Sequence, residues 1–421
     1  MAEKKLFCSE EKLREIAAEY GTPFHIYDER GIRQMARDLQ AAFGWAPGFR
    51  EHYAVKALPN PYILEILHSE GLGADCSSLA ELLLAEAVGM RGAEICFTSN
   101  DTPPEEFVKA RALGATLNLD DISHLQFVED CCGLPELLSF RYNPGAMQEG
   151  LDSNEIIGHP EDAKYGLTHG QLLEAIRMAK AKGVERFGLH TMIVSNELEP
   201  KFLAATAKMM FELAVEVWEK LGVKPEFINL GGGLGLAYRP EEQPLELAAL
   251  GELIRREYER IMVPAGLGQT ALVMESGRLM TGPFGMLVTK AIHTKDTYKH
   301  YIGVDACMAH LMRPALYGAY HHLTVLGKAG EPLDHVYDVV GSLCENNDKF
   351  AVDRRLPEIR VGDLLAIHDT GAHGTAMGFN YNGKLRCQEL LLGEDGSVRL
   401  IRRGETLADL FATLDYPGLG L

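Results

Sequence analysis

The chain has 421 residues, of which 46% are hydrophobic and 24% are charged, a composition typical of a soluble globular protein with about two to three domains. Its 41 basic and 60 acidic side chains give a formal net charge of −19 at pH 7. A field of that sign repels nucleic acid and anionic membrane surfaces, so we exclude both as partners, whereas a small anionic ligand held by local groups remains possible.

The N-terminal segment "MAEKKLFCSEEKL" lacks the apolar core of a signal peptide, and no apolar run reaches the roughly 18 residues of a membrane-spanning helix. We therefore expect a cytoplasmic protein. The eight cysteines show no Cys-x-x-Cys spacing, which indicates reduced thiols rather than a metal site. Further along, "TPFHIYDERG" (22–31) is typical of a lone strand.

Short apolar runs then alternate with helical patterns as far as residue 285. In the helical pattern at 61–71 the apolar residues recur at i, i+3 and i+4, and the two prolines of 103–114 fit a helix start. About eight such alternations predict parallel strands with crossover helices, and hence a (β/α)8 TIM barrel over residues 30–285. The predicted strands cover residues 49–57, 71–78, 94–100, 115–121, 137–144, 186–196, 227–235 and 271–280.

The pattern changes after residue 285, where strand-like runs are separated by turn residues and little helix is indicated. We predict a second, C-terminal all-β domain, a β-sandwich or barrel, made of residues 1–29 and 286–421, with the lone N-terminal strand joining it. The expected strand regions are 285–295, 299–306, 321–328, 335–344, 363–373 and 384–404.

Lys56 stands inside the apolar run "HYAVKALPN" (52–60), which otherwise has the pattern of a buried strand. A buried ammonium is costly unless it is paired or has lost its charge. One interpretation is that Lys56 forms a Schiff base with an aldehyde. The other is that it lies at the end of the strand and reaches into solvent. The run alone leaves both open.

Other polar residues also fall at predicted strand ends, which face the active site in a barrel. The glycine run Gly231–Gly233 offers backbone N–H groups to which a phosphate can come close, although a glycine run is also typical of a tight turn. Ser195 could add a hydroxyl to that phosphate or cap a helix. Glu275 could hold a pyridine nitrogen in its protonated form, and Arg278 could bind a phosphate or carboxylate, or the two could form a surface ion pair.

Three segments of the predicted β domain could also carry chemistry. Cys344 and Glu345 follow a β run in "GSLCENNDKF", where a thiol could donate a proton or simply be half-buried. Arg313 and Tyr317 belong to "MRPALYGAYH", which suits carboxylate binding or an aromatic turn. Tyr381 lies in "GFNYNG", a segment typical of turns.

Seven of these segments in this order resemble the fold-type III pyridoxal-phosphate decarboxylases, and within them the diaminopimelate decarboxylase family. The resemblance covers nearly the whole chain, from "GTPFHIYD" to "YNGKLRCQELLL". The segments that carry it are "YAVKALPN", "GADCSSLAEL", "LGGGLG", "ESGR", "MRPALYGAYH", "CENND" and "YNG".

The resemblance implies that the chain binds pyridoxal 5'-phosphate and that Lys56 forms a Schiff base with its aldehyde. Cys344 would be the proton donor, and Asp75 and Glu81 would form an acidic pair near the lysine. The residues implied at the cofactor are Lys56, Asp75, His190, Ser195, Gly231, Gly232, Gly233, Glu275, Ser276, Gly277, Arg278 and Tyr381. Those implied at the substrate are Arg278, Arg313, Tyr317, Glu345 and Tyr381.

The implied reaction is decarboxylation of meso-2,6-diaminopimelate at its D-centre to L-lysine and CO2, a step of lysine biosynthesis. The family builds its site from two subunits, with the Cys-Glu loop given by the partner, so we expect a homodimer with shared active sites. The alternative is decarboxylation of another basic amino acid or polyamine precursor, such as ornithine, arginine or carboxynorspermidine. A racemase is disfavoured because it would place an arginine where this chain has Glu275, and a non-enzyme because the reactive residues are present.

The chain departs from the family pattern in four places. Met192 takes the position of the histidine that stacks on the pyridine ring, so either Met192 or His190, two residues earlier, is expected to contact the ring. Ser276 replaces a proline, and Asn346 replaces a serine near the distal end of the substrate. The segment 153–168, "SNEIIGHPEDAKYGLT", differs from the family's histidine-rich stretch.

Overall fold

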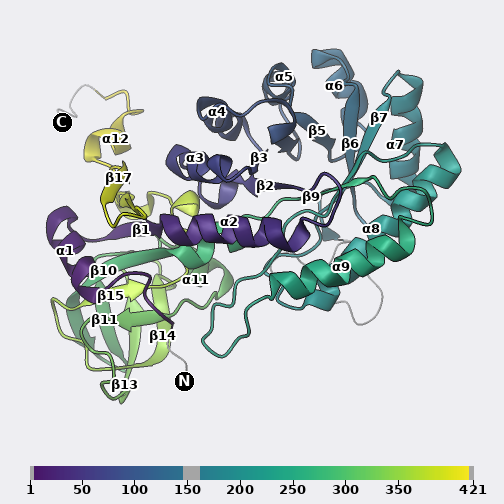
Figure 1. Ribbon diagram of the computed structural model, residues 1–421. Helices are drawn as coiled ribbons and strands as arrows, with labels where there is room; N and C mark the ends of the chain where they lie inside the picture. Colours follow the sequence, from purple (N-terminus) through teal and green to yellow (C-terminus); the bar gives the residue numbers. More distant parts are fainter. Residues whose placement is uncertain (1–3, 146–161, 417–421) are drawn as a thin grey trace. The chain divides into compact units, whose positions relative to one another are not determined.

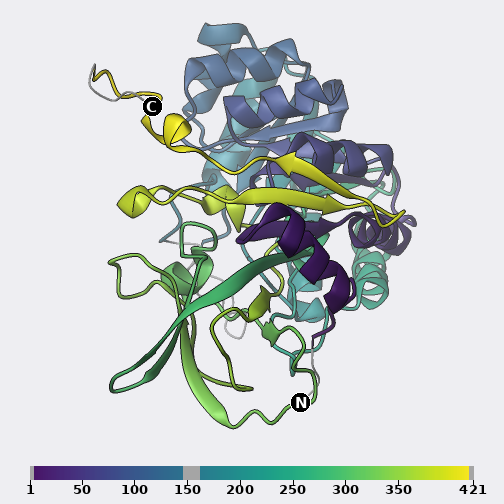
Figure 2. The ribbon, with the colours of Figure 1, turned by 90° about the vertical axis from the view of Figure 1, so that its left-hand side faces the viewer.

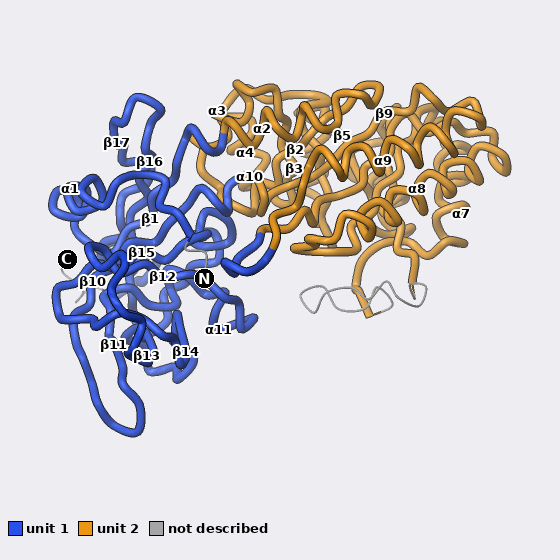
Figure 3. The backbone as a smooth tube through the Cα atoms, turned by 60° about the horizontal axis from the view of Figure 1, so that its bottom comes forward, with its two compact units in different colours: residues 1–32, 237–242, 281–421 blue, residues 33–236, 243–280 orange. Residues whose placement is uncertain are grey.

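The computed structural model describes residues 4–145 and 162–416 (Figure 1). The chain divides into two compact units, coloured separately in Figure 3. The barrel unit comprises Arg33–Leu236 and Gln243–Met280, and the sheet unit comprises Met1–Ile32, Ala237–Glu242 and Thr281–Leu421. The barrel unit is therefore inserted, in sequence, between the first strand of the sheet unit and the rest of it.

Eight parallel strands close into a barrel in the order β2 to β9, with β9 pairing back to β2. This confirms the predicted TIM barrel. The strands are β2 (Arg50–Ala54), β3 (Gly73–Cys76), β4 (Ile95–Thr98), β5 (Thr116–Leu119), β6 (Leu137–Tyr142), β7 (Arg186–Thr191), β8 (Phe227–Asn229) and β9 (Ala271–Met274). Their mostly buried residues explain why each appears in the sequence as a short apolar run.

A helix follows each barrel strand, and one more precedes β2. These helices are α2 (Glu29–Phe43), α3 (Pro61–Ser69), α4 (Leu79–Ala87), α5 (Pro104–Ala112), α6 (His124–Cys132), α7 (His169–Ala181), α8 (Pro200–Leu221), α9 (Leu247–Ile261) and α10 (Arg278–Thr281). Local sequence sets several of their ends. Asn60 accepts a hydrogen bond from the N–H of Tyr62 at the start of α3, and Gly222 ends α8 in the left-handed conformation.

The sheet unit contains a nine-stranded mixed sheet with the order β14-β13-β11-β10-β1-β16-β17, and β15 pairs with both β10 and β12. Its strands are β1 (Phe24–Asp28), β10 (Gly285–Asp296), β11 (His300–Val304), β12 (Leu323–Val325), β13 (His335–Val340), β14 (Lys349–Leu356), β15 (Leu364–Ile367), β16 (Gln388–Leu392) and β17 (Val398–Arg402). Its helices are α1 (Glu10–Tyr20), α11 (Arg313–Tyr317) and α12 (Leu407–Phe411).

The N-terminal strand β1 lies between strands from the far end of the chain. It pairs antiparallel with β10 and parallel with β16, with Phe24 opposite both Val288 and Gln388. Figure 2 shows the purple N-terminal segment beside the yellow-green strands of the C-terminal region. The N-terminal strand therefore belongs to the same sheet as strands from the C-terminal part of the chain.

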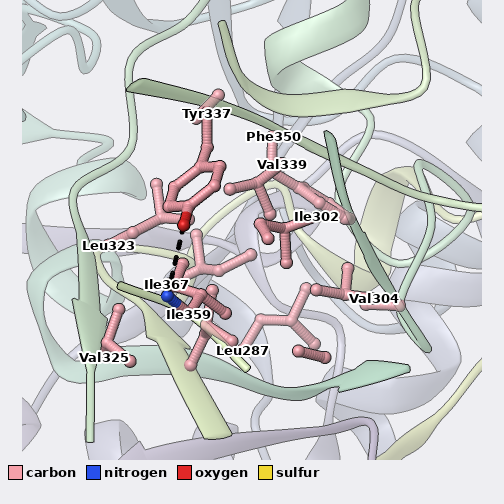
Figure 4. Packing of buried hydrophobic residues seen from close by; sticks show 14 of the residues in the cluster. Leu287, Ile302, Val304, Leu323, Val325, Tyr337, Val339, Phe350, Ile359 and Ile367 are labelled. Atoms are coloured by element: carbon pink, nitrogen blue, oxygen red, sulfur yellow. Dashed lines mark hydrogen bonds between the residues drawn. The ribbon is translucent and has the colours of Figure 1, made fainter. Parts of the chain in front are cut away.

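Two clusters of buried side chains form the core of the sheet unit. In the first, Ile302, Val339 and Phe350 converge from three different strands (Figure 4). Tyr337 packs in the same cluster and accepts a long hydrogen bond, 3.5 Å, from the N–H of Ile359. Removing such side chains from water is the main favourable contribution to the stability of this unit.

Two differences from the predicted elements concern strands. The strand predicted over 49–57 ends at Ala54, and a single 3-10 turn, Val55–Ala57, follows it. Strand β14 has no counterpart among the predicted strands, because Asp353, Arg354 and Arg355 mask its alternation. Within residues 4–145 and 162–416, none of the helices is long and apolar enough to cross a membrane.

Candidate active site

Lys56 lies just past the carboxyl end of β2, on the 3-10 turn. Its neighbours Val55 and Ala57 are fully buried, whereas 56% of the Lys56 side chain is exposed. The Nζ atom lies 3.4 Å from Oδ2 of Asp75, and this carboxylate raises the pKa of Lys56, with a smaller contribution from Glu275. The turn thus brings the amine out of the apolar run and places it beside an anion, which explains how the run accommodates a lysine.

Asp75, on β3, and Glu81 form the acidic pair expected near the lysine, but their surroundings differ. Burial raises the pKa of Asp75 to about 7, Glu275 adds to the increase and Lys56 opposes it. Oδ1 of Asp75 is buried and has no hydrogen-bond partner among the described residues. Glu81 instead accepts hydrogen bonds from the N–H and the hydroxyl of Ser77, at 2.7 and 3.1 Å. Asp75 is therefore the carboxylate that responds most directly to the charge of the amine.

Glu275 directly follows β9, and side chains from three other strands surround its carboxylate. Asn229 donates from Nδ2 to Oε1 at 2.6 Å, and His190 Nε2 lies 3.0 Å from Oε2. The Cys96 thiol lies 3.5 Å from Oε1. Burial alone would raise the pKa of Glu275, but His190, Lys56 and Asn229 lower it to about 2. The side chain is consequently a buried carboxylate anion at neutral pH.

The glycine run after β8 packs so closely against neighbouring backbone that larger residues would clash there. Gly231 and Gly233 have φ angles of +70° and +91°, a conformation that favours glycine. A Cβ atom on Gly232 would lie 2.3 Å from the carbonyl oxygen of Glu275. The loop and the Glu275 backbone therefore approach each other as closely as glycine permits.

Two N–H groups of this loop have partners in the described structure. Gly231 donates to Oδ1 of Asn229 at 2.9 Å, and Gly232 donates to the Met192 thioether at 3.2 Å. A thioether is a weak acceptor, so a phosphate oxygen would replace it readily. Met192, one of the two residues expected to contact the ring, thus lies against the glycine loop, while His190, the other, contacts Glu275.

Ser195 and Arg278 come together although 83 residues separate them. Arg278 begins helix α10, and its Nη2 atom donates to Oγ of Ser195 at 3.2 Å. A hydroxyl beside a guanidinium suits the binding of an anion. Both residues belong to the barrel unit, which also contains the glycine loop.

The remaining residues of "ESGR" fix the backbone beside Lys56. A Cβ on Gly277 would lie 2.9 Å from the Cβ of Ala57, so the segment packs directly against the lysine turn. The N–H of Ser276 donates to the carboxyl group of Glu51, and burial raises the pKa of Glu51 well above its usual value. The buried carboxyl group of Glu51 therefore anchors this segment through the N–H of Ser276.

Sequence reasoning missed three of these contacts: Glu51, Cys96 and Asn229. All three lie on barrel strands and are buried, with exposed fractions of 2%, 2% and 1%. For Asn229 a signal existed, because it is a polar residue at the end of a strand, directly before the glycine run. Cys96 and Glu51 carried none, since a lone polar residue in a short strand does not show which way it points.

Cys344 and Tyr381 are neighbours in the sheet unit. The Cys344 thiol lies 3.3 Å from the Tyr381 hydroxyl, and its N–H donates to Oδ1 of Asn382 at 2.9 Å. The contact with Cys344 raises the pKa of Tyr381. Cys344, Glu345 and Asn346 line one part of a groove of about 490 Å³. An exposed thiol with a hydroxyl beside it can donate a proton.

Arg313 and Tyr317, in the same unit, differ in their exposure to solvent. Arg313 is 2% exposed, its Nη1 atom lies 2.9 Å from Nε2 of His321, and its guanidinium lies 4.6 Å from the centre of the Tyr238 ring. Tyr317 is 47% exposed at the end of the short helix α11. The part of the 153–168 segment from 153 to 161 lies outside the described residues.

The barrel unit matches a known protein family. Residues 29–282 match the family described as "Pyridoxal-dependent decarboxylase, pyridoxal binding domain". The chain belongs to this family. Members of this decarboxylase family use pyridoxal phosphate as their cofactor.

Curated relatives and solved structures cover almost the whole of this decarboxylase. Protein TabA of Pseudomonas amygdali pv. tabaci is 45% identical over 397 residues, covering 94% of this chain and 92% of that protein. The diaminopimelate decarboxylase of Methanothermobacter thermautotrophicus is 36% identical, covering 96% and 94%. The crystal structure of diaminopimelate decarboxylase from M. jannaschii, 31% identical, superposes with a TM-score of 0.89 and covers 96% and 94%.

The residues of the barrel unit fit pyridoxal 5'-phosphate. In the Gly231–Gly233 loop the N–H of Gly232 donates to the Met192 thioether, and a phosphate oxygen is a stronger acceptor for this group. The anionic Glu275 carboxylate, with buried Asp75 nearby, favours a cationic ring nitrogen. Lys56 supplies an amine beside both, and this set is what a phosphorylated aldehyde with a basic ring requires.

Proposed function

We propose that this decarboxylase converts meso-2,6-diaminopimelate to L-lysine and CO2. For the chemistry, the observation that carries the proposal is the Lys56 amine, which lies 3.4 Å from Asp75 and within electrostatic reach of the anionic Glu275. For the substrate, support comes from the diaminopimelate decarboxylases that match along more than nine-tenths of the chain.

The candidate site residues of the barrel unit have distinct roles in this proposal. Lys56 attaches the cofactor, and the Gly231–Gly233 loop with Ser195 binds its phosphate through N–H groups and a hydroxyl. Glu275 keeps the ring nitrogen protonated, because its carboxylate is held anionic in a buried position. When bound, pyridoxal phosphate supplies an electron sink for the charge left at Cα after CO2 departs.

The sheet unit supplies the proton and the substrate contacts in this proposal. The Cys344 thiol gives its proton to Cα, and the Tyr381 hydroxyl beside it orients the thiol. A distal end with both a carboxylate and an ammonium needs one cation and one anion, which Arg313 and Glu345 provide. A substrate whose distal end carries only an amine would need only acidic side chains there.

The proposal includes a cytoplasmic homodimer in which the Cys344 loop serves the site of the partner subunit. The resemblance to the two-subunit family and the exposure of Cys344 support this assembly. All eight cysteines are free thiols, which fits a reducing compartment. Mixing Lys56→Ala with Cys344→Ala protein tests the sharing of sites, because mixed dimers would regain one intact site, whereas sites within one chain would regain none.

The deciding experiment follows CO2 release from a panel of amino acids with cofactor-loaded protein. The panel contains meso-diaminopimelate, L-lysine, L-ornithine, L-arginine and carboxynorspermidine. Release of CO2 from diaminopimelate alone supports the proposal. Release from another member of the panel would show that the enzyme decarboxylates that amino acid instead. Lys56→Ala is the control, because it removes the amine that holds the cofactor and should abolish both the visible absorbance and turnover.

A further inference from the structure

Side chains from two different strands contact the two oxygens of the Glu275 carboxylate. Asn229, on β8, holds Oε1 at 2.6 Å, and His190, on β7, lies 3.0 Å from Oε2. A carboxylate offers only acceptors, so the hydrogen in the second contact belongs to Nε2 of His190. The plane of the carboxylate is therefore fixed by two donors rather than left to the side chain's own torsions.

The His190 contact is sealed from solvent. His190 is 1% exposed and Glu275 is 8% exposed. Among the described residues, Nδ1 of His190 has no hydrogen-bond partner, so the contact through Nε2 is the one that satisfies this imidazole. In such a buried place water cannot substitute for a lost donor, and an unsatisfied carboxylate oxygen is costly.

Glu275 needs this support because of where it lies. It follows the end of β9 and has three rotatable side-chain bonds, and buried Asp75 adds a second acidic group nearby. When Asp75 is ionised, its charge repels the Glu275 carboxylate. The Nε2–H donor of His190 on Oε2 offsets this repulsion and favours one orientation of the carboxylate.

We propose that His190 is a positioning residue for the decarboxylation: its Nε2–H orients the Glu275 carboxylate toward the pyridine nitrogen of the cofactor. This inference rests on the proposed function and adds to it a residue that acts through Glu275. It gives His190 a role different from contact with the face of the ring.

Two substitutions of similar polarity separate the roles of His190. Glutamine carries an amide nitrogen close to the position of the imidazole Nε2, so His190→Gln keeps the donor to Glu275. Asparagine is one carbon shorter and cannot reach, so His190→Asn loses it. His190→Met has no donor but fills similar space, and it serves as the second non-donor variant if the asparagine protein does not fold.

The readouts are turnover and the state of the pyridine nitrogen. Each variant is loaded with pyridoxal phosphate labelled with 15N in the ring, and the 15N chemical shift is recorded without substrate. We expect His190→Asn and His190→Met to lower kcat by about ten- to a hundredfold with little change in KM, and to move the 15N shift toward that of the unprotonated ring. We expect His190→Gln to restore most of both.

Two results would overturn the inference. A wild-type 15N shift and kcat in His190→Asn and His190→Met would show that the donor is not needed. Equal impairment in His190→Gln, with an unchanged 15N shift in all variants, would show that the imidazole acts by packing or by contact with the ring. The 15N measurement needs no substrate, so it tests the positioning role of His190 even if the substrate panel shows that the enzyme acts on a different amino acid.

Discussion

Replacing Asp75 by asparagine removes the carboxylate nearest to the Lys56 amine and should lower the pKa of that amine. Two unit charges 3.4 Å apart attract by roughly 1 kcal/mol in water and roughly 5 kcal/mol at an effective dielectric constant of 20. Because 56% of the Lys56 side chain is exposed, the lower half of that range applies. At about 1.4 kcal/mol per unit, the pKa of Lys56 should fall by roughly one to two units.

The direction of this shift in the pKa of Lys56 follows from the order in which Asp75 and Lys56 titrate. Asp75 has a pKa of about 7, so it is ionised at the higher pH where Lys56 loses its proton. Its charge therefore opposes that loss in the wild-type protein and cannot oppose it in Asp75→Asn. At any pH between neutrality and the titration of the wild-type lysine, the variant contains more of the free amine that attacks an aldehyde.

The assay follows the loading of apoprotein with pyridoxal phosphate by absorbance over a series of pH values. The midpoint of the rate profile should move to lower pH in Asp75→Asn. Glu81→Gln is the matched control, because it also removes one negative charge but from a carboxylate with a weaker effect on Lys56, so its shift should be smaller. A midpoint that does not move in Asp75→Asn, or moves to higher pH, would refute the reasoning.

Three further substitutions test other parts of the structure. Cys344→Ala should lower turnover by on the order of a hundredfold while cofactor loading is unchanged, as measured by steady-state kinetics and absorbance. Arg402→Met should destabilise the sheet unit by about 3 to 5 kcal/mol in urea unfolding, because it removes the guanidinium that neutralises the fully buried Glu389 carboxylate, and the loss should shrink as falling pH protonates Glu389. Gly232→Ala should weaken cofactor binding and cost about 1 to 3 kcal/mol of stability, because its Cβ would meet the Glu275 carbonyl.

Each of these has a control in the same chain. Cys131→Ala removes a half-buried thiol of α6 and should leave turnover unchanged. Arg403→Met breaks an exposed ion pair with Asp409 and should barely move the unfolding midpoint. Gly170→Ala meets no atom within 4 Å and should not affect the cofactor. Equal effects in a variant and its control would contradict the corresponding argument.

Much of the fold was predictable because barrel strands and their helices have different periods. The eight buried strands appear as apolar runs, and the helix starts are marked by residues such as Pro61, Pro104 and Pro200. Strand β14 was missed because its exposed half carries three charges in succession. The position of Lys56 on a turn was missed because Val55 and Ala57 continue the apolar run of β2.

The candidate site was predictable where the residue type alone indicates a chemical role. It was less predictable where the role depends on which side chains lie nearby in the fold. Lys56, Glu275 and the glycine run are unusual at strand ends and attract attention. That His190 contacts a carboxylate depends on the register of β7 against β8 and β9, which places the ends of three strands together. Register between distant strands is a property of the closed barrel and not of any short segment.

The pairing of β1 has a consequence for how the protein is made. Phe24 is synthesised near the start, but one of its partners, Gln388, emerges 364 residues later. The last barrel strand ends at Met274, so the barrel can close on the ribosome while the sheet still lacks most of its strands. Until then, β1 keeps open edges that can pair with another nascent chain. The order of synthesis therefore makes completion of the sheet a late step with high contact order, and the step most exposed to misassembly.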